Sequence, residues 1–204
     1  QEHLDKCAAD NTIRCIYLTG NGKAFCAGQD LAELSGDDPM PIEKILGEHY
    51  NPIVTRLRNI EKPVVCAVNG VAAGAGANIA LACDVVVATA SASFIQAFSK
   101  IGLIPDSGGT FILPRLIGFQ KASAMMMLAD KVSAADAEKM GMIYKCFSDE
   151  FFEDESMNIA ITLSNMPTKG LALTKKALNS SFNNTFEQQL QVEDAFQYTA
   201  AQTQ

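Results

Sequence analysis

The chain has 204 residues, of which 48% are hydrophobic, and it carries a formal net charge of −7. This length and apolar fraction suffice for one sizeable core and fit a single α/β unit. The acidic balance, without any basic tract, argues against nucleic acid as a partner, because phosphate binding requires clustered Lys and Arg.

Targeting and metal-binding signals are absent from the sequence. The longest apolar stretches are interrupted by Gly, Asn or Asp before they reach membrane-spanning length, and no signal peptide is visible, so we expect a cytoplasmic protein with no membrane partner. Neither His3 nor His49 lies near another good ligand, so no metal site is expected. The six cysteines include no C-x-x-C pair and predict free thiols in a reducing compartment.

The first predicted elements alternate between strand and helix. Ile13–Gly20 has the pattern of a buried strand and runs into a turn of small residues over 21–31. A helix is expected over Ile42–Asn59. Pro63 then starts the next buried strand, Val64–Val68.

The stretch Asn69–Asn78 is the most informative part of the sequence, because small residues follow a strand and lead into the helical Ile79–Ala82. Small residues let bare backbone N–H groups approach a ligand, and a helix N-terminus adds free donors and a positive dipole end. The stretch therefore indicates an oxyanion site or, alternatively, close packing of helix on sheet. Together with the turn over 21–31, it could place two backbone donors on one carbonyl oxygen and stabilise a thioester enolate.

The remaining elements continue the alternation and then become helical only. We expect strands at Val85–Ala88, around Phe94 and at Ile143–Phe147, a helix over Leu116–Leu128, a helix that Ser133 caps and Gly141 ends, and only helices from Asp149 onward. The chain is accordingly divided into a core, residues 1–148, and a helical region, residues 149–204.

Charged residues between these elements are expected to be solvated. Glu61 and Lys62 lie at a predicted helix end, and Lys175 and Lys176 follow each other on a predicted helix. Such residues usually face water, so we expect solvated charges at the helix end and an exposed face at the lysine pair, although a lysine of that pair could also contact phosphate groups of a bound substrate.

Four motifs, in this order and spacing, resemble the crotonase superfamily of enoyl-CoA hydratases and isomerases: AFCAGQDL, VNGVAAGAGANIALACDVVVA, FSKIGLIPDSGGTFILPRLIG and SAADAEKMGMI. The resemblance runs through nearly the whole chain. Within the superfamily the run GLIPDSGGT is most similar to isomerases that act on ring 1,2-epoxyphenylacetyl-CoA or shift the double bond of a 3-enoyl-CoA.

The resemblance implies a fold, an assembly and a set of contacts. The fold would be a spiral of βαβ units followed by C-terminal helices that drive assembly into a trimer or hexamer; an N-terminal strand and a last helix of the family are expected to be missing here. The backbone N–H groups of Gln29 and Ala75 would hold the thioester carbonyl. Coenzyme A would enter only as part of the acyl-CoA substrate, with no separate cofactor, and would contact Ala27, Gln29, Asp30, Leu31 and Gly74.

The acid–base residue distinguishes the activities of the superfamily. Its hydratases place two glutamates around a water molecule, and the matching positions here are Asn78 and Phe98. Neither side chain can act as a general base. Asp106 remains, and by resemblance to the isomerases it would move the proton, although an aspartate before a helix is also an ordinary N-cap.

The sequence predicts an acyl-CoA isomerase that stabilises a thioester enolate. Two alternatives stay open: a hydratase or another crotonase-type lyase or hydrolase in which Asp106 activates water, and an acyl-CoA-binding protein that has lost the chemistry.

Overall fold

Two four-stranded sheets form the centre of the molecule in a computed structural model that describes residues 1–30 and 41–202. The first sheet is parallel throughout and has the order β1 (Ile16–Thr19), β3 (Val64–Val68), β5 (Val85–Thr89) and β8 (Lys145–Phe147). The second has the order β2 (Ala24–Cys26), β4 (Val71–Ala73), β6 (Ser93–Ile95) and β7 (Lys131–Ser133), with β7 antiparallel to β6.

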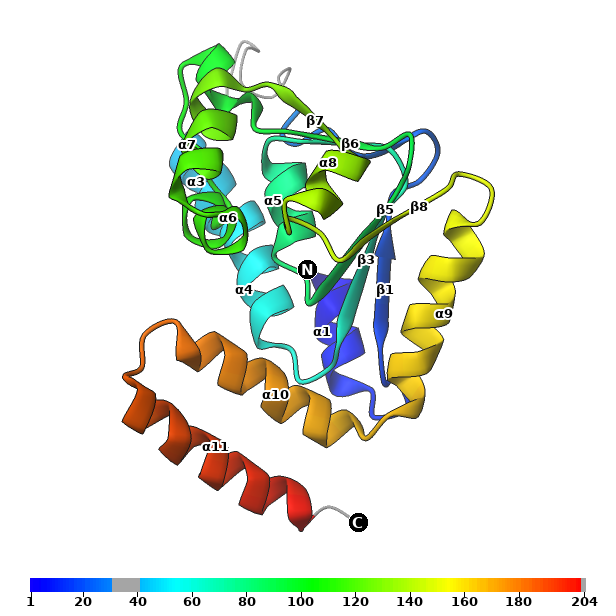
Figure 1. Cartoon of the computed structure of the whole chain (residues 1–204), viewed down its shortest axis with the longest axis vertical. Helices are drawn as coiled ribbons and strands as arrows, with labels where there is room; N and C mark the ends of the chain where they lie inside the picture. The colour runs from blue at the N-terminus through cyan, green and yellow to red at the C-terminus, as the bar shows by residue number, and fades with distance from the viewer. Residues whose placement is uncertain (31–40, 203–204) are drawn as a thin grey trace.

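The chain passes from one sheet to the other as it winds. β1, β3 and β5 belong to the first sheet, and the strands that directly follow them, β2, β4 and β6, belong to the second. Each turn therefore adds one strand to each sheet, and the expected spiral followed by C-terminal helices is confirmed (Figure 1). Every residue of β3 is fully buried, as an apolar run in the centre of a parallel sheet requires.

The second sheet differs from the sequence expectation, because β2 and β4 lie inside the two stretches expected to be turns of small residues. Strands of three residues are too short to produce a readable alternation of apolar and polar side chains. Their small residues let neighbouring segments approach closely: a Cβ on Gly76 would lie 2.3 Å from the carbonyl oxygen of Cys26.

The helices mostly lie on the outside of the spiral. The expected helix over Ile42–Asn59 is present as α3, a π-helical turn η1 and α4. The expected helix over Leu116–Leu128 is present from Phe119 onward as α7, but its first residues belong to α6, because Gly118, with φ of 78°, separates the two helices. The helices are α1 (Glu2–Ala9), α3 (Ile42–Lys44), η1 (Ile45–Tyr50), α4 (Asn51–Asn59), α5 (Ala75–Leu81), the 3₁₀ helix η2 (Ala97–Ile101), α6 (Gly109–Ile117), α7 (Phe119–Leu128), α8 (Ala134–Lys139), α9 (Phe152–Asn165), α10 (Thr168–Ser181) and α11 (Phe186–Ala201).

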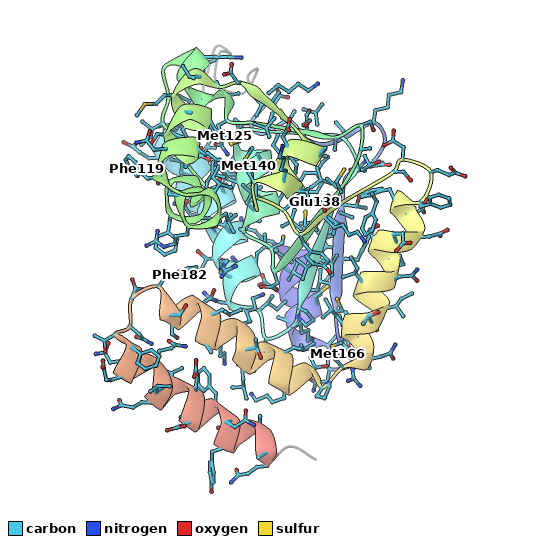
Figure 2. The ribbon with its side chains drawn as sticks, in the orientation of Figure 1. Phe119, Met125, Glu138, Met140, Met166 and Phe182 are labelled. Atoms are coloured by element: carbon cyan, nitrogen blue, oxygen red, sulfur yellow. The ribbon has the colours of Figure 1, made fainter. Side chains whose placement is uncertain are left out.

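The main core lies between the sheets and the helices α4 to α8. Met125 on α7 and Met140 after α8 both pack against it (Figure 2). Ser133 caps α8 by accepting from the backbone N–H of Asp136, as its sequence predicts. On the far side of the first sheet, Phe147 and Phe152 form a smaller cluster under α9.

Two lysines expected to be solvated are buried instead. The Lys62 ammonium donates to the carbonyl oxygens of Cys7, Ala8 and Asp10, and so caps the C-terminal end of α1. The Lys175 ammonium donates to a carboxylate oxygen of Asp84 at 2.8 Å and to the Leu57 carbonyl at 2.6 Å. Both lysines are 7% exposed. The expectation was wrong because a charge pattern on a helix does not show which face the core will cover.

Lys176 behaves as the sequence predicts. Its side chain is 42% exposed and pairs with Glu61. Lys175 therefore joins α10 to the core, while its neighbour faces outward. Burial lowers the pKa of the Lys175 ammonium, and the Asp84 carboxylate opposes that shift. In the part of the chain that the structure describes, no helix is both long and apolar enough to cross a membrane.

We expect Lys175→Met to lower the free energy of unfolding by about 3–5 kcal/mol, because it leaves the Asp84 carboxylate with the Val64 N–H as a donor but without its cation, and removes the donor to the buried Leu57 carbonyl. Lys176→Met is the matched control and should cost less than about 1 kcal/mol, since it removes an exposed pair. Urea unfolding of both variants measures the difference. Equal losses would contradict the structural role of Lys175.

Candidate active site

The two stretches of small residues meet at the N-terminus of α5. β2 pairs with β4, so the segments that follow these strands leave the sheet side by side. A Cβ placed on Gly28 would lie 3.5 Å from the backbone nitrogen of Ala75, which puts the Gln29 backbone beside the start of the helix. Ala75 is the first residue of α5, and the N–H of a first helical residue has no acceptor within its helix. The arrangement brings together the two segments that were expected to supply backbone donors.

The other residues of the first segment lie toward the surface. Ala27 and Asp30 are exposed, and Gln29 is half-buried with its side-chain amide donating to the Asp30 carbonyl at 3.4 Å. Gly74, the N-cap of α5, lies next to the ring of Phe98, since a Cβ on it would be 3.7 Å from that ring. Leu31 lies outside the described residues.

Asp106 lies in the turn between η2 and α6, at a hollow of about 330 Å³. Its carboxylate accepts a hydrogen bond from the Ser107 hydroxyl at 2.8 Å. Burial raises the pKa of the Asp106 carboxyl, and the Ser107 hydrogen bond opposes part of the shift. Ile42, Leu46, Leu103 and Ile104 supply most of the apolar lining, and Asp106 is the one ionisable group among the described lining residues.

The alternative role of Asp106 as a helix cap does not agree with the geometry. The N-cap of α6 is Gly108, and no side chain caps this helix by a hydrogen bond. The Asp106 backbone carbonyl, by contrast, accepts from the Gly109 N–H at 2.8 Å. The carboxylate is therefore free of the helix terminus and is held by Ser107, a contact that the sequence analysis did not anticipate.

The two positions that match hydratase glutamates are both buried. Phe98 is 6% exposed and Asn78 fully buried. Asn78 lies one helical turn after Ala75, and its amide nitrogen donates to the Asp106 carbonyl at 2.9 Å. Its amide oxygen accepts from Gln96 at 2.7 Å. Asn78 thus links the helix that presents Ala75 to the turn that presents Asp106, and Gln96 is a further residue that the sequence analysis missed.

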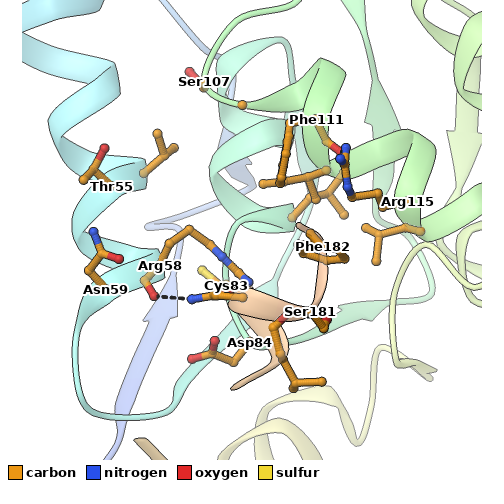
Figure 3. A pocket seen from close by; sticks show the side chains of 17 residues that line it. Thr55, Arg58, Asn59, Cys83, Asp84, Ser107, Phe111, Arg115, Ser181 and Phe182 are labelled. Atoms are coloured by element: carbon orange, nitrogen blue, oxygen red, sulfur yellow. Dashed lines mark hydrogen bonds between the residues drawn. The ribbon is translucent and has the colours of Figure 1, made fainter. Parts of the chain in front are cut away.

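A second hollow of about 560 Å³ lies between α4, α6 and the end of α10 (Figure 3). Ser107 and Gly108 line both hollows, so they adjoin at this turn. On the α6 side the Arg115 guanidinium lies 3.6 Å from the centre of the Phe111 ring, and Phe182 contacts that ring edge-on at 5.6 Å.

Metal ligands and reactive thiols are two other sources of chemistry in an active site. The described residues hold no group of three His, Cys, Asp or Glu that could bind a metal ion. The six cysteines are free, and Cys66 and Cys83 are buried. Burial raises the pKa of Cys15 to about 11 and that of Cys66 above its usual range, so both remain protonated and poorly nucleophilic.

Comparisons with known proteins agree with this architecture. The family model described as Enoyl-CoA hydratase/isomerase matches residues 1–204. The chain is 46% identical over 205 residues to the 1,2-epoxyphenylacetyl-CoA isomerase of Escherichia coli (strain K12), which covers 99% of this chain and 78% of that protein. It is 43% identical over 189 residues to a Rhodobacter capsulatus protein named "Probable enoyl-CoA hydratase", with 93% of this chain and 73% of that one covered. The crystal structure of an enoyl-CoA hydratase from Bacillus anthracis matches with a TM-score of 0.92 at 29% identity, over 98% of this chain and 77% of that one.

The raised pKa of Asp106 predicts how the free energy of unfolding depends on pH. Because the folded protein binds this proton more tightly than the unfolded chain does, stability is lost as pH rises from the unfolded pKa, about 4, through the raised folded pKa. Asp106→Asn keeps an acceptor for Ser107 but removes the titration. We therefore expect the free energy of unfolding of Asp106→Asn, relative to the parent, to rise with pH over this range and then level off.

Asp149→Asn is the control with the opposite sign. Hydrogen bonds from Thr89 and Ser91 lower the pKa of the Asp149 carboxyl. Its replacement should cost stability at neutral pH, and the cost should fade as pH falls through the lowered pKa. Chemical denaturation across a pH series measures both variants, and a relative stability of Asp106→Asn that does not change with pH would contradict the prediction.

Proposed function

The chain belongs to the enoyl-CoA hydratase/isomerase family, and on this premise we propose that it is an isomerase that moves the double bond of an acyl-CoA by way of a thioester enolate. The observation that carries the proposal is the composition of the hollow. One carboxylate, that of Asp106, stands in an apolar lining, while the positions of the two hydratase glutamates hold an amide and a phenyl ring. One base is enough to move a proton between two carbons.

Backbone donors stabilise the charge that the reaction creates. The thioester oxygen lies between the N–H groups of Gln29 and Ala75, and the positive end of α5 points toward it. Negative charge grows on this oxygen when a neighbouring C–H proton leaves. Donors fixed in advance by the sheet and the helix lower that barrier without having to reorganise.

Asp106 transfers the proton. Its ionised carboxylate removes a proton from the α carbon of a 3-enoyl thioester, which leaves a dienolate with charge on the thioester oxygen. The protonated Asp106 then returns the proton to the γ carbon, and the double bond moves from the β,γ to the α,β position. The pKa of this carboxyl is raised toward neutral pH, so its carboxylate is a stronger base than that of a solvated aspartate.

A ring substrate is the second part of the proposal. The 46% identical relative from Escherichia coli is named as a 1,2-epoxyphenylacetyl-CoA isomerase, and apolar side chains contribute to the lining of both adjoining hollows. With an epoxide of a dearomatised ring, the same two donors would steady charge while the ring expands to an oxepin. We therefore propose a substrate from the breakdown of phenylacetyl thioesters or from fatty-acid metabolism.

The proposed contacts to coenzyme A come from the segment after β2 and from Gly74 at the start of α5. We propose that Ala27, Gln29, Asp30, Leu31 and Gly74 line the coenzyme A part of the substrate, with no separate cofactor. The exposure of Ala27 and Asp30 beside the oxyanion donors supports this location.

Assembly into a trimer or hexamer is proposed from the C-terminal helices. α11 buries none of its residues within the chain, although it contains exposed apolar side chains, and it lies with α10 as a hairpin beside the core (Figure 1). The exposed apolar residues of this hairpin are Leu178, Phe182, Phe186, Leu190 and Tyr198. A second copy of the chain would cover them.

A hydratase is the alternative that one comparison favours, because the Rhodobacter capsulatus relative, 43% identical, carries that name. In a hydratase Asp106 would activate water. Double-bond migration and water addition, measured on the same 3-enoyl-CoA and 2-enoyl-CoA, separate the two activities.

We expect Asp106→Asn to slow isomerisation by about 10²–10⁴-fold, the loss typical of a missing general base, with thioester binding nearly unchanged. Product formation from a 3-enoyl-CoA, followed in samples quenched at successive times, measures the rate, and calorimetry with a non-reactive thioester measures binding. Asp130→Asn, which changes an exposed aspartate, is the matched control and should keep normal turnover. Near-normal turnover of Asp106→Asn would exclude it as the base.

The proposed oxyanion donors are main-chain groups, so two further variants should differ in turnover. Gln29→Ala keeps the backbone N–H and should retain most activity, whereas Ala75→Pro deletes a donor and should lose about 10²–10³-fold in turnover. Circular dichroism and thermal unfolding establish that each variant is folded. If folded Gln29→Ala lost as much as Asp106→Asn, the glutamine side chain would be the reacting group and the assignment would fail.

A further inference from the structure

We propose that Asn78 is a positioning residue for Asp106, and that Gln96 orients the Asn78 amide. The inference rests on the proposed function, because it adds two residues to the site that acts through Asp106. Asn78 touches neither the carboxylate nor a substrate in this arrangement. It acts on the backbone of the turn from which the carboxylate projects.

The hydrogen bonds have one possible direction. The Asp106 backbone carbonyl can only accept, so the nitrogen of the Asn78 amide faces it, at 2.9 Å. The Asn78 oxygen is then left to accept, and the Gln96 amide donates to it at 2.7 Å. Asn78 is fully buried and Gln96 is 1% exposed, so water does not compete for these bonds. The side-chain amides of Asn78, on α5, and of Gln96, directly after β6, thus fix the Asp106 carbonyl.

The turn needs such support because its backbone is unfavourable. Ser107 has φ of 51° and Gly108 has φ of 77°, so two successive residues are left-handed, and Ser107 carries a side chain that disfavours this region. The Asp106 carbonyl accepts from the Gly109 N–H at 2.8 Å in addition to Asn78. Within the part of the chain that the structure describes, loss of the Asn78 donor would leave the Asp106 carbonyl with a single hydrogen bond, that from the Gly109 N–H.

Packing reserves the space for the Asn78 amide. A Cβ added to Gly109 would lie 2.4 Å from the Asn78 nitrogen and 2.6 Å from its amide carbon. Gly109 is the first residue of α6 and has no left-handed φ, so the absence of its side chain is required by Asn78 rather than by the backbone. Gly109→Ala therefore displaces the Asn78 amide without changing Asn78 itself.

The position that holds a glutamate in hydratases thus serves a different purpose here. An amide cannot exchange protons with substrate, but it donates a hydrogen bond that a carboxylate would not. A shift of about 1 Å at a reacting group is enough to lower turnover about 10²-fold. A loosened turn would therefore lower kcat while KM, which depends on the rest of the thioester, changes little.

The test compares Asn78→Leu with Thr89→Val. Both replace a buried hydrogen-bonding side chain with an apolar one of similar size, but Thr89 bonds to Asp149, away from the Asp106 turn. We expect Asn78→Leu to lower kcat about 10–100-fold with KM within about two-fold, and Thr89→Val to leave both unchanged. In an Asp106→Asn background, Asn78→Leu should cause no further loss, since its effect passes through Asp106.

A second measurement does not depend on the chemistry. Hydrogen exchange of the Gly109 amide reports directly on its bond to the Asp106 carbonyl. We expect faster exchange of the residue 109 amide in both Asn78→Leu and Gly109→Ala, with no change in Thr89→Val. Gly109→Ala provides the same readouts if Asn78→Leu does not fold.

The outcomes separate the inference from the proposed function. Unchanged exchange in the turn, or a kcat loss that multiplies with that of Asp106→Asn, would overturn the positioning role of Asn78. If Asp106→Asn kept normal turnover, the proposed base would be wrong, and the exchange measurement alone would decide whether Asn78 holds the turn.

Discussion

The close approach of two backbone segments at the N-terminus of α5 is the constraint on which the rest of the structure depends. β2 and β4 pair inside the second sheet, and the chain after each strand reaches the same point. This requires residues without bulk, as the 2.3 Å distance from a Cβ on Gly76 to the Cys26 carbonyl shows. A single side chain at that place would separate the sheet from the helix and move the Ala75 N–H away from the Gln29 segment.

Burial sets the environment of the proposed base, Asp106. Asp106 stands in an apolar hollow, with the Ser107 hydroxyl as a partner for its carboxylate. Desolvation raises the pKa of the Asp106 carboxyl, and the hydrogen bond from Ser107 opposes part of this rise because it stabilises the ionised form. Asn78 and Phe98 stand at the positions that match the two hydratase glutamates, so these positions supply no carboxylate. This difference is the reason for which we propose movement of a proton within the substrate over addition of water.

Buried lysines connect the helices to this framework. Lys175 joins α10 to Asp84 and to the end of α4, and Lys62 closes the C-terminal end of α1. Each ammonium satisfies several acceptors, which offsets the cost of removing its charge from water. α11, by contrast, is attached to the chain through α10 and leaves apolar side chains exposed. The buried lysines thus hold α1 and α10 to the core, whereas the apolar side chains of α11 lie at the surface of the chain.

The sequence by itself determined the spiral of strands and helices and the C-terminal helical region, and it singled out Asp106 and the two stretches of small residues as the candidate site. Those features depend on local composition: apolar runs, glycine where backbones approach, and an acid in a turn before a helix. Only the tertiary structure decided that both turns contain strands, that Gly118 divides one expected helix, and that Lys62 and Lys175 are buried. It also decided that Asn78, Gln96 and the Asp106 carbonyl meet. These features depend on which elements come together in space, and residues far apart in the sequence carry no local pattern that indicates their contact.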